Sequence, residues 1–184
     1  MSNPLRILRT LDRHLGSSFD LYIYGRSAIA LGFPGAPARF EATMDVDAIL
    51  PSRDVRALEQ NEDFWNAQQK TNEDLGESGL YFTHLFEDQQ VILTPDWLDH
   101  VVTLGGFGFT KLRLFRPSTV DLVLTKMMRV DPEDREDILF LVGQVDRGMD
   151  ELKVALARAK IPSVAEIKDA FEKNREWLRE TTGV

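Results

Sequence analysis

Short apolar runs alternate with segments of helical period along the first two thirds of the chain. Leu8, Leu11 and Leu15 share one face of a predicted helix over residues 4–15, and arginines occupy another face. The runs without helical period are short and flanked by glycine, proline or charged residues, which favours strands. The predicted strands cover residues 20–24, 44–50, 80–86, 91–93, 100–104 and 111–115.

Start signals for helices stand between and after these strands. Residues 27–31 predict a short helix after Gly25. Residues 52–74 are largely helical, with Ser52 and Asn61 as candidate N-caps. The last third is helical throughout, with three strong start signals. They are Ser118 with Asp121, Asp131 with Pro132, and the capping box Ser163-x-x-Glu166.

This order of elements predicts an α+β fold, a mixed β-sheet packed with helices and followed by a C-terminal helical extension. We place the α/β core at residues 1–116 and the C-terminal helical region, packed on the core, at residues 117–184.

Composition excludes several classes of site. The 184 residues carry a formal net charge of −8 and no cysteine, which rules out disulfides, thiolate metal sites and cysteine nucleophiles. No apolar run approaches the roughly 20 residues of a membrane span, and residues 1–15 contain no apolar signal segment. We therefore expect a cytoplasmic protein without a membrane partner. Residues 41–100 hold 14 acids against 3 bases, so a few of these acids are candidates for holding divalent metal.

The sharpest candidate is Asp45-Val46-Asp47. Residues i and i+2 of a strand point to the same face, about 6.6 Å apart. Two carboxylates so close, on an apolar strand, are costly unless they are neutralised, and a divalent cation does this. A half-exposed strand with two solvated acids is the alternative for this spacing taken alone.

A second candidate lies upstream at Gly25-Arg26-Ser27. A strand ends in glycine there and a helix begins, and backbone N–H groups at a helix start suit phosphate. A glycine that simply turns the chain is the alternative.

Taken together, a strand, a Gly-x-Ser turn, a short helix and a second strand with Thr43-x-Asp45-x-Asp47 resemble the nucleotidyltransferase superfamily, whose fold is that of DNA polymerase β. Residues 121–129 and 131–138 are similar to the Lys-x-x-Arg and Asp-x-x-Asp segments of abortive-infection nucleotidyltransferases, toxin partners in toxin–antitoxin systems, and of their uncharacterised bacterial relatives. The resemblance covers about residues 21–141.

The resemblance implies a transferase that moves a nucleoside monophosphate from an NTP to an acceptor hydroxyl. In that scheme Asp45 and Asp47 bind Mg²⁺, in one or two ions, while Gly25, Arg26 and Ser27 position phosphate. The family also has a third carboxylate on the next strand, where residues 80–86 have none. Glu87 follows directly and, by its alternation with Thr83, is the substitute candidate for the catalytic set.

Lys126 is the remaining candidate, as a cation that steadies the triphosphate. It lies in the most positive stretch of the chain, residues 111–129, at the position of the lysine in the resembled segment. A structural alternative stays open. Lys126 or Arg129 can instead form ion pairs with Asp134 or Asp137 in a helical hairpin.

The acceptor is open between a tRNA end, a protein side chain and a small molecule, and an antitoxin-like protein is a possible partner. Two alternatives from other classes are a catalytically silent nucleotidyltransferase-fold binding module and an ion-paired scaffold whose acids hold no ligand. A carboxylate within metal reach of Asp45 and Asp47 distinguishes the enzyme from both.

Overall fold

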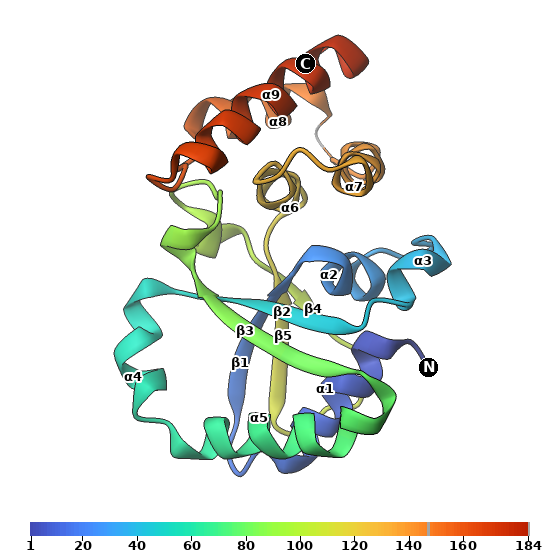
Figure 1. The fold of residues 1–184 in the computed structure, drawn as a ribbon, viewed down its shortest axis with the longest axis vertical. Coiled ribbons are helices and arrows are strands. Elements are labelled where there is room, and N and C mark those ends of the chain that lie inside the picture. The colour runs from blue at the N-terminus through green and yellow to red at the C-terminus, as the bar shows by residue number, and fades with distance from the viewer. Residues whose placement is uncertain (147, 184) are drawn as a thin grey trace. The chain divides into compact units, whose positions relative to one another are not determined.

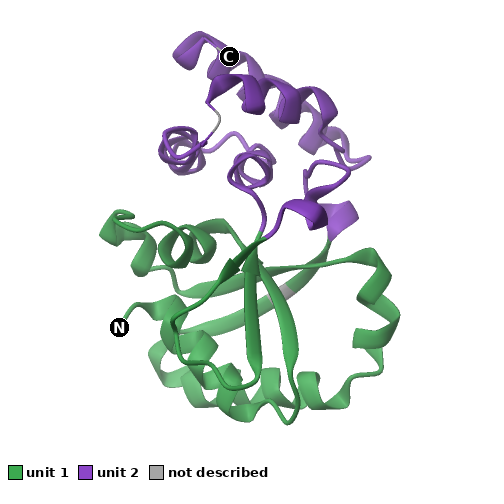
Figure 2. Ribbon diagram, turned by 180° about the vertical axis from the view of Figure 1, so that it is seen from behind, with its two compact units in different colours: residues 1–87, 102–116 green, residues 88–101, 117–184 purple. Residues whose placement is uncertain are grey.

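The computed structural model describes residues 1–146 and 148–183, apart from the side chain of His84. They divide into two compact units, coloured separately in Figure 2. The α/β unit comprises residues 1–87 and 102–116, and the helical unit comprises residues 88–101 and 117–184. One limit between the units, 116/117, coincides with the predicted boundary. Residues 88–101, which the sequence assigned to the core, group with the helical unit instead.

A five-stranded mixed sheet forms the centre of the α/β unit, in the order β3-β2-β1-β5-β4 (Figure 1). Within it β1 runs antiparallel to β2 and parallel to β5, β2 runs parallel to β3, and β4 runs antiparallel to β5. The predicted α+β class with its mixed sheet is confirmed. The strands are β1 (Phe19–Tyr24), β2 (Asp45–Leu50), β3 (Tyr81–Glu87), β4 (Val102–Leu104) and β5 (Leu112–Arg116).

One face of this sheet is the core of the unit. Val46 and Ala48 of β2 are fully buried there, and Phe64 of the covering helix α5 stacks on Phe19 of β1. Helix α1 adds its predicted apolar face, on which Leu8 and Leu11 are fully buried. The helices of this unit are α1 (Asn3–His14), α2 (Gly25–Gly32), α3 (Ala38–Glu41), α4 (Val55–Glu59) and α5 (Glu62–Leu75), with 3₁₀ turns η1 (Ser52–Asp54) and η2 (Gly76–Ser78).

The helical unit consists of four α-helices and the segment 88–101. The side chain of Asp121 joins the two parts, because its Oδ1 accepts hydrogen bonds from the N–H and the hydroxyl of Thr94 at 2.7 and 2.9 Å. The elements are η3 (Asp88–Gln90), η4 (Trp97–His100), α6 (Thr119–Lys126), α7 (Pro132–Val142), α8 (Met149–Arg158) and α9 (Ala165–Thr182). Among the described residues, no helix has the length and apolar character that a membrane span needs.

Two sequence predictions are wrong in this unit. Residues 91–93 do not form a strand of the sheet; Val91 and Ile92 are buried in the helical unit, and Leu93 makes an isolated bridge with Lys160. An apolar run of three residues can be buried in the core of a helical unit as well as in a sheet, so the run alone does not predict a strand. The capping box at Ser163 is also wrong, because α9 begins one residue later than that motif requires and has Val164 as an uncapped N-cap.

The predicted starts at Asn61, Ser118 and Asp131 agree with the sequence, whereas Ser52 is not an N-cap but the first residue of a 3₁₀ turn that follows Pro51. Asn61 accepts from the N–H of Phe64 at 3.0 Å, Ser118 accepts from Asp121, and Asp131 accepts from Glu133 and Asp134. These side chains satisfy backbone donors that a helix leaves without a partner in its first turn.

Candidate functional site

Asp45 and Asp47 lie at the beginning of β2 on the sheet face opposite Val46 and Ala48. Both aspartates are half-buried, whereas Val46 and Ala48 are fully buried. The hydroxyl of Thr43 donates to Asp45 Oδ1 at 2.9 Å. Among the described side chains, no lysine, arginine or histidine forms an ion pair with Asp45. The strand therefore presents two carboxylates side by side on the face away from the core.

The β1–α2 turn lies beside this pair because of the strand register. Tyr24, the last residue of β1, is directly opposite Asp47 in the antiparallel pairing. The chain then enters α2 at Gly25, whose φ is +65°. A Cβ added at Gly25 meets nothing within 4 Å, so the glycine is needed for its backbone conformation rather than for space. The structure thus brings Gly25, Arg26 and the carboxylate pair to one end of β1 and β2.

Ser27 takes part in this turn from the inside. Its side chain is buried, with the residue 2% exposed, and its hydroxyl donates to the carbonyl of Tyr24 at 2.9 Å. The hydroxyl therefore fixes the exit of β1. A phosphate contact at this position would come from the backbone N–H groups of the α2 start, where no described side chain caps the helix.

A bulge in β3 decides which residue of that strand faces Asp47. The pairing of β2 with β3 is Val46 with Phe82 and then Ala48 with Leu85, so two residues of β3 oppose Asp47 alone. One of them is Thr83, whose hydroxyl hydrogen-bonds to Asp47 Oδ1 and lies 2.9 Å from the carbonyl of Val46. A threonine thus stands on the neighbouring strand beside the carboxylate pair.

Glu87 does not share this position. It pairs with Leu50, at the opposite end of β2 from Asp45, and the bulge puts it on the other face of the sheet. At about 3.3 Å per residue, the three steps along the strand from Asp47 to Leu50 separate Glu87 from the pair by about 10 Å. The predicted alternation with Thr83 fails because a bulge adds one residue and reverses side-chain parity beyond it. The structure does not bring Glu87 to the candidate site.

The donor set suits a magnesium ion that keeps other ligands. No cluster of three metal-binding acids or histidines occurs among the described side chains. Mg²⁺ is commonly held by one or two carboxylates together with water and substrate phosphates, so Asp45 and Asp47 fit one ion bound with a nucleotide. A second ion is poorly provided for by these two residues alone.

Lys126 belongs to the helical unit and is bound by two carboxylates there. Its Nζ lies 2.8 Å from Asp134 Oδ1 and 2.8 Å from Asp137 Oδ2, and its side chain is only 10% exposed. Arg129 pairs with Asp134 at 2.8 Å. The ion-paired hairpin that the sequence left open is therefore present. A phosphate contact by Lys126 would require it to exchange or share these partners.

Asn174 of α9 completes this network and has no signal in the sequence. It is fully buried, and its amide donates to the carbonyls of Met127 and Arg129 at 3.3 and 2.8 Å. Its Oδ1 accepts from Arg135 at 3.1 Å. A single asparagine in a helix rich in charged residues is expected to be exposed. The hydrogen bonds of Asn174 to the segment after Lys126 are therefore visible only in the structure.

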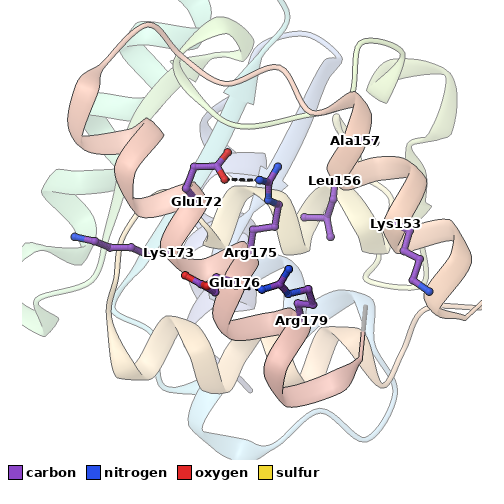
Figure 3. A pocket seen from close by; sticks show the side chains of 8 residues that line it. All are labelled: Lys153, Leu156, Ala157, Glu172, Lys173, Arg175, Glu176 and Arg179. Atoms are coloured by element: carbon purple, nitrogen blue, oxygen red, sulfur yellow. Dashed lines mark ion pairs between the residues drawn. The ribbon is translucent and has the colours of Figure 1, made fainter.

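A cavity of about 580 Å³ opens between α8 and α9 of the helical unit (Figure 3). Its basic side chains have acidic neighbours on their own helices. Arg175 pairs with Glu172 at 2.6 Å and Lys173 with Asp169 at 2.7 Å. This cavity is close to neutral and carries no sign of an anion site.

Comparison with known families gives one match, over residues 8–174, to the family described as "Nucleotidyltransferase of unknown function (DUF6036)". Searches of curated proteins and of solved structures found no match. Because the family model spans most of the chain, this protein belongs to that nucleotidyltransferase family. The resemblance inferred from residues 21–141 is confirmed at the level of the superfamily.

Proposed function

We propose that this nucleotidyltransferase-family protein transfers a nucleoside monophosphate from an NTP to an acceptor hydroxyl, at the end of the sheet where β1 and β2 meet. The supporting observation is the register of Tyr24 with Asp47, which places a helix start and two carboxylates beside each other. A triphosphate carries several negative charges, so it needs both an anion-binding turn and a cation.

In this proposal Asp45 and Asp47 hold Mg²⁺, which would supply charge neutralisation on the triphosphate. The N–H groups at the start of α2, with Arg26 beside them, bind a phosphate in the favourable field of the helix N-terminus. The hydroxyls of Thr43 and Thr83 fix the two carboxylates. The acceptor oxygen bonds to the α-phosphorus, the bond to the β-phosphate oxygen breaks, and pyrophosphate leaves while the hydroxyl proton passes to solvent or to the acceptor's own base.

A second candidate function is nucleotide binding without rapid transfer. The observation that favours it is the place of Thr83, because a hydroxyl stands beside Asp47 where the resembled enzymes have a third acid. General-base assistance is typically worth about 10²–10⁴-fold, so its loss slows transfer while leaving binding intact. A tRNA or protein acceptor, and a toxin role with an antitoxin-like partner, are proposals that rest on the resemblance alone.

The test incubates the protein with each α-labelled NTP, Mg²⁺ or Mn²⁺, and total RNA or cell extract, and follows transfer of the label. We expect a labelled product that is lost in Asp45→Asn with Asp47→Asn. Several kcal/mol of charge stabilisation would disappear, a loss of about 10³-fold or more. Equal labelling by the double variant would place the chemistry elsewhere.

Calorimetry with NTP and Mg²⁺ separates the two candidates. Mg²⁺-dependent binding that is lost in the double variant, with no labelled product from any acceptor, supports the binding module. No binding at all by the wild type contradicts both candidates.

A further inference from the structure

Three arginines form a row along the exposed side of α1. Arg6, Arg9 and Arg13 are all exposed, while Leu8 and Leu11 on the other side are fully buried. Spacings of three and four residues place the arginines within about 60° of arc, with rises of about 4.5 and 6 Å between neighbours. The row is a linear array of three positive charges on a protein whose net charge is −8.

No described carboxylate lies within ion-pair distance of these three arginines. Arg13 Nη2 donates to the hydroxyl of Thr10 at 3.2 Å, and Thr10 in turn donates to the carbonyl of Arg6 at 3.0 Å. The guanidinium of Arg13 is thereby held over the turn that carries the other two. The α8–α9 cavity differs, because its arginines are neutralised by glutamates on the same helix.

The row borders a groove between α1 and the end of α5, with a volume of about 460 Å³. The carboxylate that lines this groove is Asp74, and it is bound by His14 at 2.8 Å. The groove therefore keeps an excess of positive charge, in contrast to the acidic stretch over residues 41–100.

The start of the row lies close to the beginning of β2. Asn3, three residues before Arg6, donates its side-chain amide to the carbonyl of Ala42 at 3.3 Å and contacts Met44 Sδ at 3.9 Å. Residue 44 immediately precedes Asp45. A ligand bound along α1 thus has one end near the segment that leads into the carboxylate pair.

We propose that Arg6, Arg9 and Arg13 bind consecutive phosphates of a polynucleotide strand whose terminal hydroxyl is the acceptor. This inference rests on the proposed transfer at Asp45 and Asp47. Guanidinium groups bind phosphate oxygens through paired N–H donors, and a polynucleotide repeats phosphates at a regular interval. An acidic protein could also bind the three arginines. A polynucleotide end is favoured because it carries both repeated phosphates for the arginine row and a hydroxyl that could reach the carboxylate pair.

The test measures binding of a fluorescent single-stranded RNA 20-mer by anisotropy, in EDTA and without NTP, over a range of KCl concentrations. Binding then does not depend on the chemistry at Asp45 and Asp47. Changing Arg6, Arg9 and Arg13 to Gln removes three contacts, each worth about 0.7 in the slope of log affinity against log salt. We expect the slope to fall by about 2 and the affinity to fall at least about tenfold.

The matched control changes Lys173, Arg175 and Arg179 of α9 to Gln, which removes the same charge from an ion-paired surface. We expect its slope to stay within about 0.5 of the wild type, because no phosphate contact is lost there. An equal drop in both variants would show a net-charge effect and overturn the proposal. Unchanged binding in the α1 variant, or no RNA binding by the wild type, would also overturn it. Polyglutamate competing as well as RNA for the α1 row would identify an acidic protein partner instead.

Calorimetry with NTP and Mg²⁺ keeps this result distinct from the proposed function. NTP binding by calorimetry should be the same in the α1 variant and the wild type, because the arginines do not hold the nucleotide. If NTP binding is lost only in Asp45→Asn with Asp47→Asn and the α1 variant keeps its RNA affinity, the proposed nucleotide site stands. The proposal that α1 binds a polynucleotide would then be wrong.

Discussion

Two close pairs of aspartates, Asp45 with Asp47 and Asp134 with Asp137, are handled differently by the two units. In the helical unit Asp134 and Asp137 are 4% and 0% exposed, and Lys126 bridges them. In the α/β unit Asp45 and Asp47 are half-buried, and threonine hydroxyls bind them. A buried carboxylate must be neutralised by the fold itself, whereas a half-buried pair with hydroxyl partners can take its cation from outside. The comparison indicates a structural role for the helical pair and is consistent with the ligand binding proposed for Asp45 and Asp47.

The largest expected effect tests the structural pair. Lys126→Met leaves the carboxylates of Asp134 and Asp137 buried without their shared cation, and breaking such a pair typically costs about 3–5 kcal/mol. We expect urea unfolding to show a loss of that size, with NTP affinity unchanged in the folded fraction. The control, Asp45→Asn with Asp47→Asn, should keep or raise stability because it relieves repulsion between like charges.

The opposite result would restore the role that the sequence suggested for Lys126. Weaker NTP binding by more than about 1.5 kcal/mol, with stability unchanged, would show that the lysine contacts phosphate.

Asp12 provides the next test, because its carboxylate is bound by backbone N–H groups rather than by a cation or by hydroxyls alone. Burial raises the pKa of Asp12, but N–H donors from Thr110, Lys111 and Leu112 and the hydroxyl of Thr110 outweigh it and hold the pKa below its ordinary value. Asp12→Asn should therefore cost about 2 kcal/mol at pH 7, in the range for hydrogen bonds to a charged group.

The sign of the pH dependence follows from the lowered pKa. The contribution of Asp12 is fully present above the carboxyl pKa of the unfolded chain, about 4, and it is lost as the pH falls through the lower folded pKa. Denaturant titrations at pH 7, 5 and 3 should show the difference between wild type and Asp12→Asn shrinking at pH 3. A constant difference would show that packing, and not charge, supplies the effect.

A smaller effect is expected at Thr83, which in the proposed function acts on substrate through Asp47. Thr83→Val removes the hydroxyl that orients Asp47, and loss of such a supporting partner commonly reduces metal affinity or activity about 10–100-fold. We expect about a tenfold lower rate of transfer, or tenfold weaker Mg²⁺-dependent NTP binding. Thr83→Ser keeps the hydroxyl and should restore most of the loss. Equal rates and NTP affinities for Thr83→Val and Thr83→Ser would show that Thr83 contributes only packing.

The sequence predicted the order of strand, turn, helix and strand because each step has a local cause. Gly25 breaks β1, Asn61 and Ser118 cap their helices, and the apolar run over residues 44–50 needs a buried strand. The carboxylates of Asp45 and Asp47 share a face by the period of a strand alone. Each of these features depends on neighbours along the chain, so no tertiary information was required.

The features that the sequence missed depend on contacts between distant segments. The apolar run 91–93 fits a strand locally, but its burial is provided by the helical unit. The role of Asn174 depends on its hydrogen bonds to the carbonyls of Met127 and Arg129, which lie 47 and 45 residues earlier in the sequence. The bulge in β3 arises from the pairing of β3 with β2. Residues 81–87 contain no glycine or proline that would have indicated a bulge in the sequence.

The smallest expected effect is at Glu87, and it follows from that bulge. Because Glu87 pairs with Leu50 on the face away from Asp45 and Asp47, Glu87→Gln should change the rate of transfer by less than about twofold. Glu77→Gln in η2 is a matched control, since it removes the same charge from the same unit outside the sheet. A loss of about 10²-fold or more at Glu87 alone would identify it as the catalytic base and would require β3 to pair with β2 without the bulge. A twofold change shared by both variants reports only their common loss of charge. An unchanged rate leaves Thr83 as the described side chain of β3 that contacts the carboxylate pair. The contrast between the two aspartate pairs then rests on hydroxyl partners in one unit and cationic side chains in the other.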